Sequence, residues 1–340
     1  MSNLGQAQRY RLVVSSLVAA TLAAVVLHVG LGSSQLLSPL TVLRELLSGP
    51  NGSGTDNFVV WTLRLPRASA ALLVGGILAA GGCVAQALFR NPLAEPYTLG
   101  VSSGAAIGGV LLMTLAPAMP YLQFAFPVAG FIGGLGALLL VLALTRSATG
   151  FQSGSVLLAG TLVGGFLAAA LSLTLIAAQN DTNKVLRWLL GSLTPMFWPR
   201  VLLLLVALVV GVAVIWRQLF ALNALSVGED TARSLGIDSR RVGMILMLVT
   251  TFMVSIAVGS VGIIGFLGLI APHLGRRLVG TDWPQVFPVA TLLGMILLLL
   301  SDALAQRTIL QTELPVGAVT AILGAPTLLV LLRKQGAGIG

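Results

Sequence analysis

Uncharged apolar runs of about twenty residues recur along this chain and limit its possible folds more than any other feature. The first of them, residues 12–31, contains no Asp, Glu, Lys or Arg. A helix needs about 20 mainly apolar residues to cross the hydrocarbon of a bilayer. Only 9% of the chain is charged and 56% is apolar, whereas a soluble domain has about 25% charged residues. The sequence therefore predicts an all-α, multi-pass membrane protein.

About ten such segments lie along the 340 residues, and we expect them to form one transmembrane domain over residues 1–340. Glycine pairs inside several segments favour close approach of helix backbones. Residues 32–64 are polar and rich in turn formers, which indicates an exposed loop. A short amphipathic piece at about residues 185–191 is expected at the interface. The predicted spans are residues 12–31, 68–89, 97–115, 121–145, 156–178, a sixth ending at 217, 242–258, a short eighth after 268, 286–301 and 315–332.

Positive charge predicts the orientation of these spans. Ten spans place both termini on one side, and the loops of that side would hold twelve of the nineteen Lys and Arg residues. Cytoplasmic loops carry an excess of Lys and Arg, so we expect both termini and residues 222–241 in the cytoplasm. Arginine placed in this way, with lipid as the surroundings, accounts for the net charge of +9 without a nucleic-acid partner.

Residues 222–241 form the longest polar interruption of the apolar chain. Ser226 and Glu229 match the S-x-x-E capping box, in which the hydroxyl caps a free amide and the carboxylate reaches back. Gly236 supplies the left-handed residue that ends a helix, and Asp238 or its neighbour can cap the next one. A two-turn helix is marginal alone in water and must pack on something. The stretch is either a solvated loop or a docking element for a soluble partner.

Several catalytic classes lack the residues that they require. A G-x-x-x-x-G-K-[ST] phosphate loop needs a lysine after glycine, and neither Lys184 nor Lys334 follows one. The only histidines, His28 and His273, stand too far apart for an H-E-x-x-H zinc motif. A G-x-S-x-G match at residues 100–104 opens a membrane helix with no histidine nearby. We predict no catalytic residue, no metal site and no cofactor on this chain, so that any ATP and Mg²⁺ bind to a partner.

The first functional class is a transport subunit without catalytic chemistry of its own. Ion-coupled carriers form a second class, and polytopic membrane enzymes a third. A carrier usually has a carboxylate within a span for a proton or cation relay. The nearest candidate here is Asp302, close to the outer end of the ninth predicted span, which disfavours a secondary transporter. A requirement for an ATPase subunit would distinguish the first class from both alternatives.

A set of short motifs runs in order from about residue 60 to the end of the chain. They are LRLPR at 63–67, QALFRNPLAEP at 86–96, LGVSSGA at 99–105, VGE at 227–229, ARSLG at 232–236, GFLGLIAPH at 265–273, ELPVG at 313–317 and LGAP at 323–326. Together they resemble the permease subunits of the ATP-binding-cassette (ABC) importers for iron chelates and cobalamin, the FecCD family. One departure is DWP at 282–284, where these permeases often have D-H-R.

The resemblance implies a type II ABC importer permease: a homodimer of ten-helix subunits in the bacterial inner membrane, with a pathway along its twofold axis. It also implies two ABC ATPase subunits below and a periplasmic binding protein above. Residues 222–241 match the coupling helices that enter a cleft on the ATPase. The coupling residues are Ser226, Gly228, Glu229, Arg233, Leu235 and Gly236, and the cytoplasmic gate residues are Asn91, Leu93, Ser153 and Gly154.

Three arginines on the predicted outer side break the charge rule and need a reason. Arg64 and Arg67 flank Pro66 at the mouth of the second span, and Arg307 lies between the ninth and tenth. Arginines at span ends often snorkel to lipid headgroups. The resemblance implies instead a cationic rim that receives carboxylates of the binding protein, since a guanidinium can hold a carboxylate by two hydrogen bonds. We assign the three to binding-protein docking.

The substrate implied by the resemblance is an iron chelate, with haem first, a ferric siderophore second, and cobalamin as the alternative. All three are bulky, so a broad pathway lined by small and apolar side chains suits each of them. No pore residue in the sequence distinguishes them.

Overall fold

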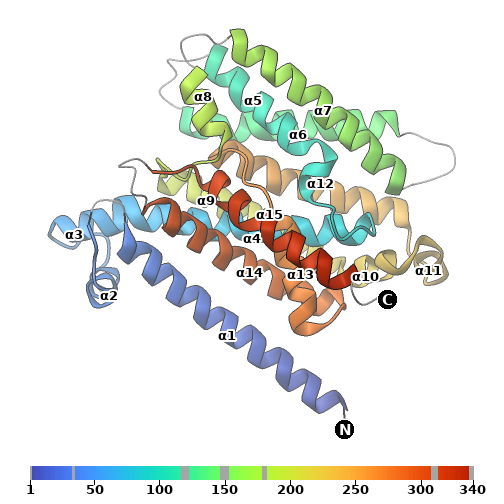
Figure 1. Ribbon diagram of the computed structural model, residues 1–340, viewed down its shortest axis with the longest axis horizontal. Coiled ribbons are helices and arrows are strands. Elements are labelled where there is room, and N and C mark those ends of the chain that lie inside the picture. The colour runs from blue at the N-terminus through green and yellow to red at the C-terminus, as the bar shows by residue number, and fades with distance from the viewer. Residues whose placement is uncertain are drawn as a thin grey trace.

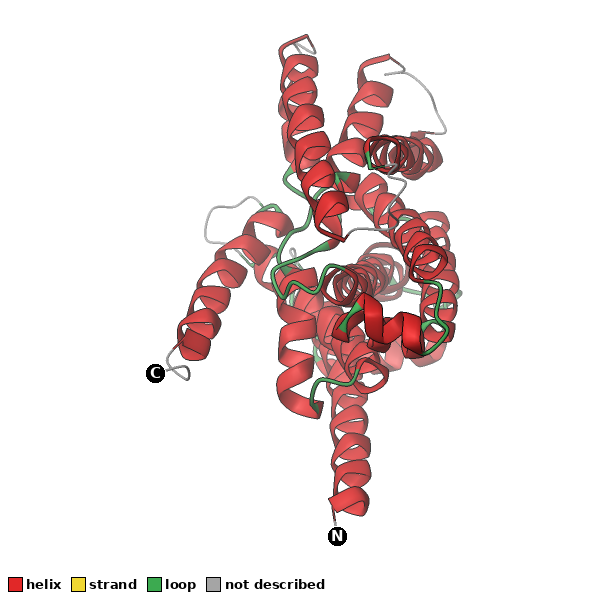
Figure 2. Ribbon diagram, turned by 90° about the vertical axis from the view of Figure 1, so that its right-hand side faces the viewer, coloured by secondary structure: helices red, strands yellow, loops and turns green. Residues whose placement is uncertain are grey.

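The structure is a computed structural model that describes residues 2–32, 35–115, 122–145, 153–177, 182–307 and 313–336. Within these ranges all regular elements are helices (Figures 1 and 2). They are α1 Ser2–Leu31, α2 Pro39–Ser48, α3 Thr55–Phe58, η1 Val59–Arg64, α4 Leu65–Leu88, η2 Pro96–Leu99, α5 Val101–Leu115, α6 Leu122–Leu144, α7 Ser153–Ala177, α8 Thr182–Leu189, α9 Trp198–Arg217, α10 Leu219–Val227, α11 Glu229–Ser234, α12 Ser239–Val261, α13 Leu267–Val279, α14 Trp283–Ala305 and α15 Val316–Gly336.

Among the described residues, seven helical segments are long and apolar enough to cross a membrane. They are Gly5–Leu31, Thr55–Leu88, Ala125–Leu144, Ser153–Ile176, Trp198–Arg217, Ser239–Val261 and Trp283–Ala305. The other three predicted spans fall on the shorter helices α5, α13 and α15. Every predicted segment therefore contains a helix, but length and composition do not confirm the predicted number of about ten spans.

The polar stretch at residues 32–64 is more ordered than the exposed loop that we predicted. It contains α2, whose start is capped by the Ser38 hydroxyl accepting the Thr41 N–H at 3.1 Å. Farther along, α3, the π-helical η1 and α4 follow one another without a break from Thr55 to Leu88. The prediction was wrong because the densest run of turn formers, residues 49–54, fills only the connection between α2 and α3, and the residues on both sides of it form helices.

Helix α4 lies at the centre of the bundle and has most of its residues buried. It packs on α14, α13, α9 and α12. Gly75 of α4 faces Gly294 of α14, and Gly82 faces Gly268 of α13; a Cβ on either α4 glycine would collide with the facing backbone. Small residues allow this close approach, which confirms the interpretation of the glycine pairs in α4 as packing positions.

Two groups of helices flank the centre. Helices α5, α6, α7 and α8 gather on one side, where α6 packs on α5 and α12, while α1 lies on the other side against α14 (Figure 1). The start of α1, the end of α15 and the pair α10–α11 lie at one end of the bundle, and α2 and α3 lie at the other (Figure 1). Seen from the first end, the N and C ends leave the bundle on different flanks (Figure 2). Both termini and residues 222–241 thus share an end, as predicted.

Candidate functional site

The predicted coupling stretch forms a compact helical element at the end of the bundle that holds both termini. Helix α11 ends in a Schellman motif: Gly236 has φ +74°, and the N–H groups of Gly236 and Ile237 donate to carbonyls of α11 at 3.0 Å each. Asp238 then caps α12, its Oδ1 accepting the Arg241 N–H at 3.0 Å. The helix end predicted at Gly236 and the cap predicted at Asp238 are confirmed.

The capping box predicted at the start of this element is wrong. Ser226 lies in the last turn of α10, and its hydroxyl donates to the Asn223 carbonyl at 2.7 Å. Gly228 separates α10 from α11, which begins at Glu229 without a side-chain cap. The pattern misled because α10 continues past Ser226, so this hydroxyl finds a carbonyl within its own helix rather than a free amide ahead of it.

The element presents both apolar and charged side chains outward. Val227 and Leu235 are 71% and 54% exposed. Asp230 and Arg233 are also exposed and form a loose pair at 3.8 Å that adds little stability. Ala232, in contrast, is fully buried and holds α11 against the bundle. An element anchored on one side, with apolar and charged groups on the other, suits docking to a protein better than contact with water alone.

A sharp hinge in the chain after α4 lies next to this element in space. Arg90 has φ +50°, unusual for a residue with a side chain. The Asn91 Oδ1 then accepts the Leu93 N–H at 2.9 Å in an Asx turn, which leaves Leu93 44% exposed. The Arg90 guanidinium points to the coupling element, with Nη2 3.9 Å from Glu229 Oε1. This contact brings the predicted gate segment at Asn91 next to the coupling residues.

The second predicted gate segment lies across from the same element. Ser153 and Gly154 begin α7, and with Arg90 they line an open cavity of about 610 Å³. The opposite wall is the coupling element, including Gly228 and Glu229. The structure therefore brings together predicted gate and coupling residues that lie far apart in the sequence. Asn91 and Leu93 adjoin this cavity through Arg90 but do not line it.

Beyond the hinge the chain turns back toward the break between α12 and α13. The Tyr97 hydroxyl donates to the Ile264 carbonyl at 2.7 Å, and the Ile264 N–H donates to the Tyr97 hydroxyl oxygen at 3.3 Å. Burial raises the pKa of the nearby Glu95 to about 7, opposed in part by a hydrogen bond from the Phe266 backbone. Phe266 itself has φ +71°. Sequence reasoning placed Glu95 and Phe266 in motifs but gave none of these four residues a role.

A second line of contacts joins the coupling element to the start of α13. The Trp283 N–H donates to Asn223 Oδ1 of α10 at 3.2 Å, and the Arg276 guanidinium lies 5.4 Å from the centre of the Trp283 ring. Arg276 Nη2 donates to Gln86 Oε1 at 2.7 Å, and Gln86 Nε2 donates to the Gly268 carbonyl at 3.1 Å. The two contacts of Trp283 are those of the DWP departure, and no local pattern in the sequence indicated any of these contacts.

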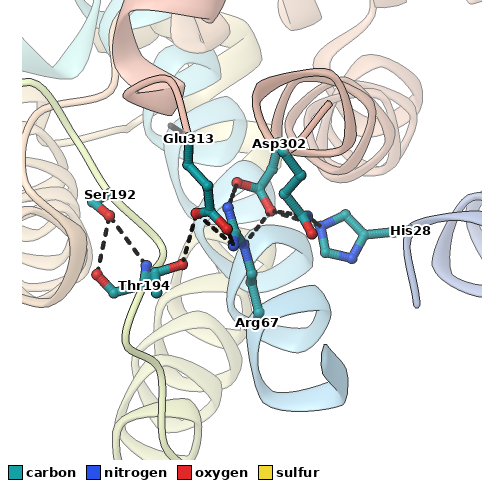
Figure 3. Close-up of polar contacts among 7 residues, drawn as sticks. His28, Arg67, Ser192, Thr194, Asp302 and Glu313 are labelled. Carbon is teal, nitrogen blue, oxygen red and sulfur yellow. Dashed lines mark hydrogen bonds and ion pairs between the residues drawn. The ribbon is translucent and has the colours of Figure 1, made fainter. Parts of the chain in front are cut away.

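At the opposite end of the bundle a buried polar network surrounds Arg67 (Figure 3). Arg67 Nε and Nη2 donate to the two oxygens of Asp302 at 2.8 and 2.9 Å, and Nη1 donates to Glu313 at 2.9 and 3.0 Å. His28 Nε2 lies 2.7 Å from Asp302 Oδ2, and Gln306 donates to the same oxygen at 2.9 Å. Asp302 is fully buried, so its charge is held by a bidentate arginine pair.

This network changes the account of the outer arginines. The structure contradicts the docking role predicted for Arg64, which is only 6% exposed and donates to the carbonyls of Val29 and Gln35 at 2.8 and 2.6 Å. The helix continues through Arg64 from Thr55 to Leu88, so Arg64 does not lie at the outer end of a span as predicted. Its side chain points into the bundle, where these carbonyls accept its hydrogen bonds. Arg67 is held by two carboxylates. Arg307 is exposed and donates to the Leu31 carbonyl at 2.9 Å.

A cavity of about 750 Å³ opens beside the Arg67 network. Its lining includes Arg67 and Glu313 of the network, Arg187 and Trp188 of α8, and Arg200 of α9. Arg200 also lies 6.0 Å from the centre of the Phe126 ring. Sites for organic ligands commonly have volumes of about 300–1,000 Å³, so this cavity has room for a chelate-sized molecule.

A helical membrane bundle with an exposed helical element at one end, and at the other a large cavity lined by arginines and apolar side chains, is typical of the membrane subunit of a transporter. The chain belongs to the FecCD transport family, whose sequence model matches residues 19–334. This confirms the resemblance drawn from the motifs.

Curated relatives cover nearly the whole chain. The chain is 34% identical to the uncharacterized ABC transporter permease protein YvrB of Bacillus subtilis, over 92% of this chain and 91% of the relative. It is 33% identical to the Fe(3+)-citrate import system permease protein YfmE of the same organism, over 91% of each. It is 38% identical to the vitamin B12 import system permease protein BtuC of Salmonella typhi, over 89% of this chain and 94% of the relative.

Solved structures agree with this assignment. A protein described as a metal-chelate type ABC transporter in an inward-facing conformation has a TM-score of 0.81 and 29% identity, covering 94% of this chain and 98% of that one. PsaBC of Streptococcus pneumoniae has a TM-score of 0.55 at 16% identity and supports the fold alone. The chain is therefore a membrane permease of the ABC-transporter class.

Proposed function

We propose that this chain is the permease of an ATP-driven importer that moves an iron chelate, haem first or a ferric siderophore, across the inner membrane into the cytoplasm. ATP and Mg²⁺ bind to separate ATPase subunits, which dock on α10–α11. The observation that carries the proposal is the shared cavity at Arg90, in which the gate residues Ser153 and Gly154 face Gly228 and Glu229. Movement of the coupling element would reach the gate segments through the pair of Arg90 with Glu229, which also lines this cavity.

The choice of an iron chelate rests on the outer cavity and on one relative. Three arginines and two carboxylates line that cavity, and both carboxylates are paired with Arg67. Arg187 and Arg200 lie outside that network, and such guanidinium groups suit haem, which carries two propionates, or a ferric carboxylate chelate. Fe(3+)-citrate import is the named role of one relative. Cobalamin is the second candidate, because the named vitamin B12 permease is more similar in sequence, at 38% identity.

The proposed active form is a homodimer with its pathway along the twofold axis, lined by α7 and α15. Both helices carry large apolar side chains that are exposed in the single chain, such as Leu162 and Phe166 of α7 at 64% and 70% and Ile322 of α15 at 70%. Contiguous apolar surface of this kind marks either lipid or a second protein surface.

We propose that a periplasmic binding protein docks at the end formed by α2, α3 and Arg307. A carboxylate of that protein would compete with Glu313, whose side chain is 34% exposed, for the outer side of Arg67. Charge reversal at Arg67 would also break its pair with the buried Asp302. Arg307 is therefore the position at which docking can be probed separately from stability.

Reconstitution tests the proposed function. The purified chain alone should hydrolyse no ATP, and its complex with the cognate ATPase and binding protein in proteoliposomes should take up labelled haem or a ferric siderophore only with ATP. Uptake of labelled cobalamin instead would overturn the choice of substrate. ATP hydrolysis by the pure chain, or uptake driven by an ion gradient without the ATPase, would overturn the class.

The coupling role of Gly236 has its own test. Gly236→Val should weaken binding of the ATPase about ten-fold, because a branched side chain at φ +74° costs about 1–3 kcal/mol. No heavy atom lies near the site where its Cβ would be, so the cost is confined to the backbone. Gly236→Asn is the matched control, since asparagine tolerates the left-handed region. Wild-type affinity of the valine variant, measured in detergent, would remove this turn from the docking site.

A further inference from the structure

A second cavity lies on the flank of the bundle, at the end that holds the coupling element. Its volume is about 430 Å³, and it lies between the first turns of α1 and the α13–α14 connection. Arg9 and Tyr10 of α1 line one wall, and Arg276, Arg277 and Asp282 line the other. Three guanidinium groups against one carboxylate leave two positive charges in excess. Neither the gate nor the outer cavity uses this site.

The position of the cavity indicates what could enter it. Arg9 lies near the start of the span Gly5–Leu31. Only 22% of the most apolar part of this span is buried in the single chain. One turn farther along the helix, Leu12 is 69% exposed, and Leu278, next to Arg277, is 36% exposed. The cationic cavity therefore opens directly onto apolar surface, at the level where α1 enters the bilayer.

We propose that this cavity binds the phosphate headgroup of an anionic phospholipid from the leaflet on the side predicted to be cytoplasmic. The forked guanidinium groups of Arg9 and Arg277 hold the phosphate oxygens, and the Tyr10 hydroxyl can donate to the ester or glycerol oxygens. The acyl chains run along α1 past Leu12. Basic pockets between membrane helices on the cytoplasmic side are typical sites for anionic headgroups.

The excess charge selects among lipids. An anionic headgroup such as phosphoglycerol neutralises one of the two surplus charges, whereas phosphatidylcholine brings its own cation into an already cationic cavity. The bound lipid would also brace the α13–α14 connection against α1. Arg276 extends from this cavity to Gln86 and Trp283, so the lipid would stabilise the segment that contacts the coupling element.

The experiment uses the full-length chain, purified in detergent and stripped of lipid. Native mass spectrometry and thermal-shift titrations would measure binding of phosphatidylglycerol, phosphatidylcholine and, separately, inorganic phosphate. The pocket variant is Arg9→Gln with Arg277→Gln. The matched control is Arg11→Gln with Arg217→Gln, which removes the same charge from exposed arginines that do not line this cavity. Arg276 is left intact because it also holds Gln86.

We expect saturable binding of phosphatidylglycerol by the wild type and the control, and about 25-fold weaker binding by the pocket variant, from a factor of about five per arginine. Arg9→Lys with Arg277→Lys keeps the charge but loses the forked geometry, so it should bind more tightly than the pocket variant and less tightly than the wild type. Equal losses in the pocket and control variants would mean general surface attraction and overturn the site. Equal affinity for phosphatidylcholine, or binding of inorganic phosphate as tight as that of the lipid, would overturn an anionic-lipid site.

Discussion

Replacing Arg67 with alanine is expected to lower the free energy of unfolding by about 3–5 kcal/mol, which is the usual cost of leaving one member of a buried ion pair without its partner. Asp302 would be left without its guanidinium partner at a fully buried position, with only His28 and Gln306 beside it. Glu313 would lose the cation that holds it at 2.9 Å, and with it the tie from α4 to the segment before α15. Thermal unfolding in detergent, followed by gel filtration, measures the loss.

A second substitution separates charge from packing. Arg67→Ala combined with Asp302→Asn should recover at least half of the lost stability, because the unpaired buried carboxylate is then absent. Arg44→Ala, at an exposed position of α2, is the control for loss of an outer arginine and should unfold like the wild type. If the double variant were as unstable as Arg67→Ala, the cost would come from lost packing instead. If Arg67→Ala itself melted like the wild type, the network would have no stabilising role.

Gly82→Val should prevent α13 from packing on α4 and cost at least about 3 kcal/mol. A Cβ at Gly82 would lie 2.6 Å from the Gly268 Cα and 2.7 Å from its carbonyl carbon. These are backbone atoms, which cannot rotate away as a side chain would, so the two helices must separate. We expect little folded protein in detergent, measured by the monodisperse yield on gel filtration.

The control for Gly82→Val is Gly136→Val on α6. It adds the same side chain inside an apolar helix, but no heavy atom lies within 4 Å of the new Cβ. Its yield should therefore match that of the wild type. A normal yield for Gly82→Val would mean that α4 and α13 can move apart without loss, and the close glycine contact would not define the bundle.

Most of the helices could be predicted from the sequence because the apolar runs that form them are local. The predicted end of the sixth span at residue 217 is the last residue of α9, and the amphipathic piece at 185–191 overlaps α8. Residues 32–64 failed the same test, since α2 and α3, with 10 and 4 residues, are too short to form such an apolar run. The side chain of Arg64 could not be placed, because the carbonyls that bind it come from Val29 and Gln35, outside its own helix.

In the candidate site, too, features that depend on local sequence were predicted and features that depend on the packing of distant helices were not. The turn at Gly236 needs only a left-handed residue at the end of a short helix, so its sequence was sufficient. The capping role of Ser226 was wrong because burial of Leu222 and Leu225 extends α10 beyond the serine, and burial is a property of the folded chain. That Ser153 and Gly228 line one cavity depends on how α7 and α10 are placed in the bundle, which no spacing along the chain records.

The pairing of Arg67 with Asp302 joins residues 235 positions apart, and this separation has a consequence for biosynthesis. A ribosome adds about 5–20 residues per second, so the carboxylate emerges tens of seconds after the guanidinium. During that interval the nascent α4 has no partner for Arg67, and the side chain must stay hydrated near the lipid headgroups. Helix α4 is thus among the first spans to leave the translocon. It reaches its final position in the bundle only after Asp302 has been synthesised and can pair with Arg67.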